Sequence, residues 1–156
     1  MTDTLSKHEK NLSAIIHAST LSKYFIPFGN FLLPLVLWTA NKNDHEFVDH
    51  NGKQALNFQI SILLYSVVLA AITGILFFVF AFEFIGFIDI FDLNRHDLSE
   101  FSHDHSGWGI HIIFMITAGM IGLGLLVLDV VCTILATLKS GKGEKYVYPF
   151  TINFIK

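Results

Sequence analysis

The feature that most constrains this chain is a long stretch without a charged side chain, which runs from Ala55 to Phe82. As an α-helix this stretch would measure about 42 Å, because each residue adds about 1.5 Å. The hydrocarbon core of a bilayer is about 30 Å thick, so the helix can cross it with some tilt. We therefore predict one transmembrane helix over residues 53–82 and a second over the similarly apolar residues 108–138.

The composition agrees with a small protein embedded in lipid. Hydrophobic residues make up 53% of the 156 residues, and 16 residues are phenylalanine, which is too apolar for a soluble domain of this size. The net charge of −3 argues against a nucleic-acid partner. A single cysteine, Cys132, excludes an intramolecular disulfide, and the mixed charges of the first residues argue against a removable signal peptide. We expect one all-α integral membrane domain over residues 1–156.

The first hydrophobic segment, residues 12–40, is interrupted by residues that break helices. These are Pro27, Gly29, Asn30 and Pro34, and each proline removes a helix hydrogen bond. We expect two short helices, Leu12–Tyr24 and Phe31–Ala40, with a break at Pro27–Asn30. Broken backbone at membrane depth survives only inside protein or beside water. Two geometries fit this pattern: a kinked span, or a re-entrant hairpin that returns to its starting side.

The distribution of basic residues favours re-entry. If residues 12–40 re-enter, nine basic residues fall on the side of the C-terminal tail and only Arg95 falls on the other. If they span, the counts are six and four. Because basic residues concentrate on the cytoplasmic side, we place the tail there and expect a multi-pass protein of the cell's inner membrane.

Two further segments lie outside the predicted spans. Residues 83–107 form an acidic, His-rich external insertion, in which apolar residues at helical spacing predict a short helix on the membrane surface: Phe84, Phe87, Ile88 and Phe91. Residues 139–156 form a cytoplasmic tail whose aromatic residues alternate along the chain and stand beside lysines. Such a pattern is typical of an anchor at the head-group interface.

A short polar motif, Asp49–Gly52, precedes the first predicted span. Its Asn-Gly pair is a turn signal, and Asp49 or Asn51 can cap the start of the helix. Beyond it, a polar stripe continues into the span with helical spacing: Gln54, Asn57, Ser61 and Tyr65. Because unpaired polar groups are costly in hydrocarbon, the stripe is expected to face either a neighbouring helix or the wall of a polar cavity.

Asp129 is an acid inside the second predicted span, which makes it a candidate functional residue. Its candidate partners are polar residues elsewhere in the membrane region: Lys23, His17, Asn57 and Gln59. Two roles remain open, a hydrogen-bonding contact between helices or the handling of a proton or cation. The set of intramembrane polar candidates is Asp129, Gln59, Asn57, Ser61 and Lys23.

Histidines are dense around the external insertion, where His103, His105 and His111 have spacing that can bind a transition metal. The alternative is a solvated polar loop. Motifs of catalytic sites, phosphate-binding loops and dinucleotide sites are missing from the sequence. We therefore predict no catalytic residues, no cofactor and a protein that is not an enzyme.

Three segments resemble a bacterial membrane protein family of unknown function: YFIPFGN (Tyr24–Asn30), FVDHNGKQALNFQIS (Phe47–Ser61) and YVYPFTINFIK (Tyr146–Lys156). That family is grouped by distant similarity with the small Tic-family subunit of the chloroplast inner-envelope import translocon. The resemblance covers most of the chain apart from its first dozen residues and the insertion. It implies a helical integral membrane protein with a broken first helix, and it carries no established activity.

Two functions follow from these features. The first is a non-enzymatic subunit or accessory factor of a membrane protein assembly, because the small size and polar helix faces call for protein partners within the bilayer. The second is a small transporter or channel formed by a homo-oligomer, which would use Asp129 and the Gln54–Tyr65 stripe. Half-helices that meet at a polar break are a common way to build ion sites in transporters.

Overall fold

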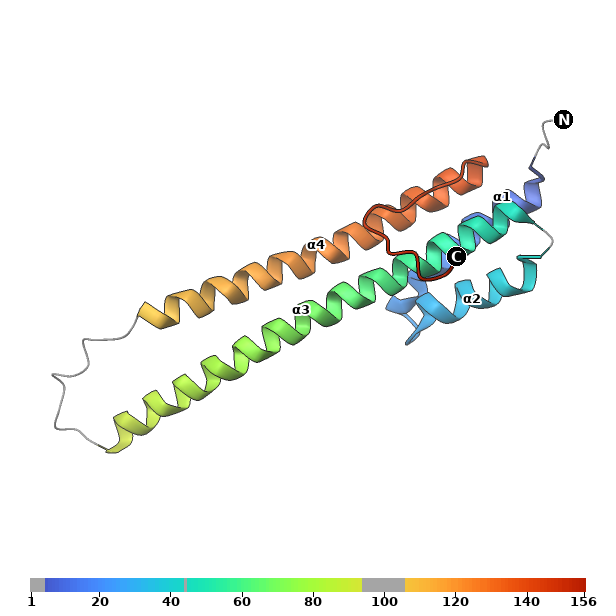
Figure 1. The fold of residues 1–156 in the computed structure, drawn as a ribbon. Helices are drawn as coiled ribbons and strands as arrows, with labels where there is room; N and C mark the ends of the chain where they lie inside the picture. The colour runs from blue at the N-terminus through green and yellow to red at the C-terminus, as the bar shows by residue number, and fades with distance from the viewer. Residues whose placement is uncertain (1–4, 44, 94–105) are drawn as a thin grey trace. The chain divides into compact units, whose positions relative to one another are not determined.

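The structure is a computed structural model, and it describes residues 5–43, 45–93 and 106–156, of which residues 83–93 and 106–108 are described by backbone alone. It divides into two compact units, Met1–Leu64 with Leu125–Lys156, and Tyr65–Gly124. Every regular element in the described ranges is helical (Figure 1). The elements in chain order are α1 (Lys7–Ser19), the 3-10 helix η1 (Thr20–Tyr24), α2 (Gly29–Asn41), α3 (Glu46–Leu93) and α4 (Ser106–Lys142).

The chain reverses direction between α1 and α2, and the two helices form a hairpin (Figure 1). Helix α1 starts with a capping box, in which Ser6 and Glu9 satisfy each other's backbone N–H groups. The break lies just after η1, where Phe28 adopts a left-handed conformation with φ of 59°. A Cβ at Gly29 would overlap the side chain of Ser22. Glycine is thus required for α2 to begin beside η1.

The break is shorter than the helix-breaking residues in the sequence predict. Pro27 belongs to it, but Gly29 and Asn30 already form the first turn of α2. Pro34 lies inside α2, buried, and does not end the helix. α1 and α2 each contain 13 residues, so each measures about 20 Å and is shorter than the hydrocarbon core of a bilayer.

The predicted turn at Asp49–Gly52 is wrong, because these residues lie within α3, which begins at Glu46. Asp49 and Asn51 therefore do not cap the helix. Asp49 accepts a hydrogen bond of 2.9 Å from the indole Nε1 of Trp38. Gly52 has no side chain to separate the helix from the Trp38 ring. Packing of α2 on this turn thus overrides the local preference of an Asn-Gly pair.

In the described part of the chain, two helices are long and apolar enough to cross a membrane, which confirms the prediction of a helical protein with two helices of this kind. The candidate spans are Glu46–Phe82 and Gly109–Lys142. The backbone of α3 continues as a helix to Leu93, so the separate surface helix expected from Glu83 onward is instead the end of α3. α4 likewise extends beyond the predicted residues 108–138 at both ends.

The first unit contains the buried core, in two adjoining clusters. One cluster joins α1, α2 and α3 through Leu12, Ile16, Trp38, Val48, Ala55 and Leu56. The other joins α3, α4 and the C-terminal tail through Phe58, Cys132, Ala136 and Tyr148. Many other buried groups are polar, and they form the candidate site described below.

The second unit presents apolar side chains on its surface, among them Ile75, Phe78 and Met120. Two of its helical hydroxyls bond within their own helix: Thr73 donates to the Leu69 carbonyl and Thr117 to the Ile113 carbonyl, each at 2.8 Å. A surface of this kind suits contact with hydrocarbon, where every polar group must find a partner inside the protein.

Substitution of Gly52 by alanine tests the contact with Trp38. A Cβ at Gly52 overlaps the indole side chain, whereas a Cβ at Gly74 in the same helix meets open space. Gly52→Ala is expected to destabilise the protein by about 1–3 kcal/mol through overpacking. Gly74→Ala, the matched control, is expected to be neutral or to stabilise by up to about 1 kcal/mol. Thermal unfolding in detergent measures both, and equal melting temperatures for the two variants would contradict the contact.

Candidate functional site

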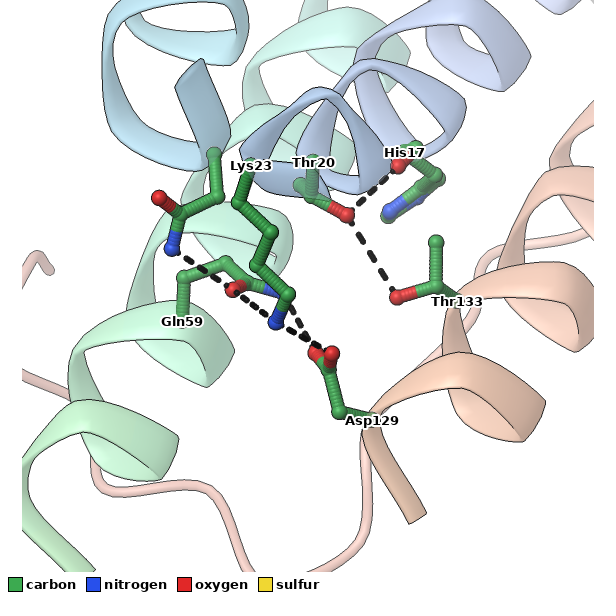
Figure 2. Close-up of polar contacts among 7 residues, drawn as sticks. His17, Thr20, Lys23, Gln59, Asp129 and Thr133 are labelled. Atoms are coloured by element: carbon green, nitrogen blue, oxygen red, sulfur yellow. Dashed lines mark hydrogen bonds and ion pairs between the residues drawn. The ribbon is translucent and has the colours of Figure 1, made fainter. Parts of the chain in front are cut away.

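The centre of the buried polar region is the carboxylate of Asp129, which is 1% exposed. The ammonium of Lys23, in η1, forms an ion pair with Oδ2 (Figure 2). The amide of Gln59, in α3, donates to Oδ1 at 2.8 Å. Both carboxylate oxygens therefore have a partner from another element of the same unit.

Gln59 connects this ion pair to the start of α2. Its amide oxygen accepts a hydrogen bond of 2.9 Å from Asn30 Nδ2 and a longer one of 3.4 Å from Lys23 Nζ. Lys23 precedes the break in the hairpin and Asn30 follows it. The residues on the two sides of the break, the cation Lys23 and the amide Asn30, therefore both bond to Gln59.

A second polar cluster surrounds His17 of α1, which is completely buried. Its Nε2 lies 2.9 Å from Asn51 Oδ1, and its Nδ1 lies 2.9 Å from the Tyr148 hydroxyl. Asn51 donates its own Nδ2 to the Phe47 carbonyl at 2.8 Å, which leaves Oδ1 as an acceptor. Ser140 of α4 also donates to this Oδ1, at 2.8 Å.

These partners define the protonation of His17. Since Asn51 Oδ1 can only accept, Nε2 carries the proton, and in the neutral ring Nδ1 accepts from the Tyr148 hydroxyl. Burial lowers the pKa of His17 from 6.5 to about 4, although the hydrogen bond to Asn51 acts in the opposite direction. Burial also raises the pKa of Tyr148. The cluster therefore joins α1, α3, α4 and the tail without a net charge.

Two buried threonines add a further polar contact between the hairpin and α4. Thr20 donates its hydroxyl to the His17 carbonyl at 2.8 Å, and its oxygen lies 3.4 Å from the Thr133 hydroxyl of α4 (Figure 2). Both threonines are completely buried. Buried polar groups thus lie between the hairpin and α4, and we call this set the polar layer.

The polar stripe of α3 binds the C-terminal tail. Asn57 Oδ1 accepts the backbone N–H groups of Phe154 and Ile155 at 3.1 and 2.8 Å, and its Nδ2 donates to the Ile155 carbonyl at 3.0 Å. Ser61 accepts the N–H of Ile152 at 2.9 Å. Gln54 accepts the N–H of Tyr148 at 3.3 Å. Three of the four residues of the stripe, Gln54, Asn57 and Ser61, therefore face an extended segment of backbone.

The tail follows α3 because its own backbone has few internal partners. It contains no regular helix after Lys142, and Phe150 has a positive φ of 57°. Tyr148 is buried and stacks on Phe58 with ring centroids 4.1 Å apart. Side chains of α3 thus replace the hydrogen bonds that a helix or sheet would supply.

The predicted site residues are brought together in part. Of the four candidate partners of Asp129, Lys23 and Gln59 reach it, whereas His17 bonds to Asn51 and Tyr148, and Asn57 bonds to the tail. The roles of Asn51, Tyr148, Ser140 and Thr133 were not foreseen. The motif around Asn51 and the aromatic residues of the tail were the available signals, but neither indicates its partner.

The predicted metal site lies mostly beyond the described part of the chain, since His103 and His105 fall outside it. His111 lies in α4, with its ring 5.6 Å from the ring of Phe80. Among residues 5–43, 45–93 and 106–156, no group of three metal-ligating side chains is close enough to hold an ion. The metal site therefore stays a prediction.

The fold and the buried polar layer define a small helical membrane protein with two candidate spans. The sequence profile of the magnetosome magnetite crystal formation protein family matches residues 8–155. The chain belongs to this family. The resemblance to a family of unknown function, grouped distantly with the Tic subunit, is therefore wrong. The three segments on which it was based lie, apart from Lys156, in the part of the chain that the magnetosome family profile matches. No curated protein and no solved structure matches the chain.

The burial of His17 predicts a pH dependence of stability. The folded pKa of about 4 lies below the unfolded value of 6.5, so the unfolded chain binds the proton first as pH falls. The stability from neutral His17 is complete above pH 6.5 and is lost progressively toward pH 4, by roughly 3 kcal/mol in total. Unfolding of wild type and His17→Gln between pH 4 and 7 measures this. A slope that is the same in both proteins would rule out His17 as its source.

Substitution of Asn57 tests the attachment of the tail. Asn57→Leu removes the acceptor of two backbone N–H groups and is expected to release the last residues, which would then be digested faster by carboxypeptidase. Thr137→Val is the matched control, because the Thr137 hydroxyl bonds only to the Thr133 carbonyl of its own helix at 2.8 Å. Loss of the tail at equal rates in wild type and Asn57→Leu would show that Asn57 does not hold it.

Proposed function

We propose that this protein is a non-enzymatic accessory factor of magnetite crystal formation, in which the buried polar layer fixes the helices in place. It would act as a helical membrane scaffold for other components of the process and not as a catalyst or an ion path. We place it as a multi-pass protein of the cell's inner membrane. The family membership supports the process, and the geometry supports the scaffold role.

The observation that carries the scaffold role is the pairing of the polar groups. Asp129 is balanced by Lys23, and its second oxygen is bound by Gln59. The amides of Asn51 and Asn57 are likewise bound within the chain. Side chains that already have partners hold a structure together. An ion path instead requires groups that exchange their partners as the ion passes.

The alternative is a homo-oligomeric transporter or channel. It is favoured by one observation, the helix break beside Lys23 and Asn30, since broken helices commonly form ion sites in transporters. In that case the charge of Asp129 would be needed for the activity itself, beyond any role in folding.

The hairpin of α1 and α2 is proposed to re-enter the membrane. The carboxylate of Glu9, near the start of α1, lies 3.4 Å from His45 Nδ1, just before α3. Both ends of the hairpin are thus at the level where α3 begins. Two helices of about 20 Å each, returning to their starting level, enter a bilayer without crossing it. This arrangement also agrees with the distribution of basic residues.

Removal of the ion pair in two steps separates the two functions. Lys23→Met or Asp129→Leu alone leaves a buried charge without its partner, which costs about 3 kcal/mol, whereas an apolar pair of similar volume is often tolerated. The double variant Lys23→Met/Asp129→Leu is therefore expected to recover stability and the normal size of magnetite crystals. The measurements are melting temperature in detergent and electron microscopy of cells that carry each variant as their only copy.

A transporter gives a different result in the same experiment. The double variant would then regain its melting temperature, but the crystals would remain abnormal because the carboxylate is still missing. That outcome would overturn the scaffold proposal. Thr39→Val, which removes a hydroxyl bonded only within α2, is the control for an unrelated polar substitution in the same region.

A further inference from the structure

The tip of the α1–α2 hairpin is an exposed aromatic and apolar surface. Phe25 is 87% exposed, Phe28 73%, Tyr24 51% and Ile26 50%. None of these side chains belongs to either buried cluster of the first unit. In water, four large apolar side chains at one turn would be costly.

The outer surface of α2 continues this apolar surface toward its C-terminus. Leu32, Leu33, Leu35 and Val36 are 40–62% exposed. At the end of α2, the ammonium of Lys42 lies 4.8 Å from the centre of the Trp38 ring. Trp and Lys are typical of the boundary between hydrocarbon and head groups. α2 therefore changes from apolar at the tip to interfacial at its end, as a helix that enters one leaflet would.

The depth of the tip can be measured along two neighbouring helices. Lys23 and Asn30, on either side of the break, both bond to Gln59 of α3. Gln59 lies six residues beyond Lys53, which corresponds to about 9 Å. Lys23 also pairs with Asp129 of α4, ten residues before Lys139, or about 15 Å. With these lysines at the head groups, the tip lies 9–15 Å deep by the same rise of about 1.5 Å per residue, within the ~15 Å of one leaflet.

From these observations we infer that the hairpin is a wedge in a single leaflet. Its exposed tip and the outer face of α2 contact the acyl chains of the leaflet on the lysine-bearing side. Among the described helices, α3 and α4 alone are long enough to continue into the opposite leaflet. The protein therefore occupies more area in one leaflet than in the other, and it prefers a membrane that is convex on the lysine-bearing side. This inference rests on the re-entrant hairpin of the proposed function, but not on the scaffold role.

The first test is the depth of the tip. A nitroxide label is attached at Phe25→Cys in full-length protein with Cys132→Ser, reconstituted in vesicles of phosphatidylcholine and phosphatidylglycerol. The label is expected to be accessible to oxygen and shielded from a water-soluble nickel complex, as a label at Val67→Cys in the first span would be. A label at Thr39→Cys, near the end of α2, is expected to be more exposed to nickel. High nickel accessibility at residue 25 would place the tip in water and overturn the inference.

The second test is the preference for curvature. Fluorescent protein is reconstituted into one mixture of small and large vesicles, and protein density is measured vesicle by vesicle together with the orientation of the tail. Density of molecules with the tail outside is expected to rise at least about twofold from the largest vesicles to the smallest. Phe25→Asp, which changes an exposed side chain and no core contact, is expected to reduce this rise.

Two outcomes of the second test would overturn the proposal that the hairpin is a wedge. A density independent of vesicle size in wild type would overturn the wedge. An equal rise in wild type and Phe25→Asp would show that the tip is not responsible, and would overturn it as well. The charge-pair experiment above measures the scaffold role by stability and crystal size alone. Failure of the wedge can therefore be distinguished from failure of the proposed function.

Discussion

The carboxylate of Asp129 is the constraint on which the first unit depends. A charge buried among apolar side chains is tolerated only when a partner of opposite charge reaches it. Helix η1 brings Lys23 to that position, and the break after it lets the chain return as α2 with Asn30 beside the same Gln59. The hairpin, α3 and α4 therefore meet at this ion pair. What the unit cannot tolerate is one of these charges without the other.

The polar residues near the start of α3 hold the other elements of the first unit together. Between Asp49 and Asn57, about two and a half turns of helix, this part of α3 contacts three partners. Asp49 and Gly52 contact Trp38, Asn51 contacts His17, and Asn57 binds the tail backbone. A stretch of sequence that looks like a loop is thus the most highly connected part of a helix. Because each partner comes from a different element, the motif determines how the unit is assembled.

Much of the architecture could be predicted from the sequence, because the absence of charge over Ala55–Phe82 and the prolines of the first segment act locally. The pairing of Lys23 with Asp129 was among the predicted options, since a buried acid needs one of few cations. The partners of His17 and Asn57 could not be predicted. They depend on where the tail lies, and a short extended segment has no periodic pattern that identifies the surface it binds. The Asn-Gly turn failed for a related reason, since Trp38 packing overrides local preference.

The central claim is that side chains of α3 hold the backbone of the tail inside the membrane-embedded unit. Amide hydrogen exchange of the protein in lipid nanodiscs, measured residue by residue by NMR, tests it most directly. The structure predicts slow exchange at Ile152, Phe154 and Ile155, whose N–H groups donate to Ser61 and Asn57, although they lie outside any helix. Exchange at these three amides as fast as in an unstructured peptide would contradict the account.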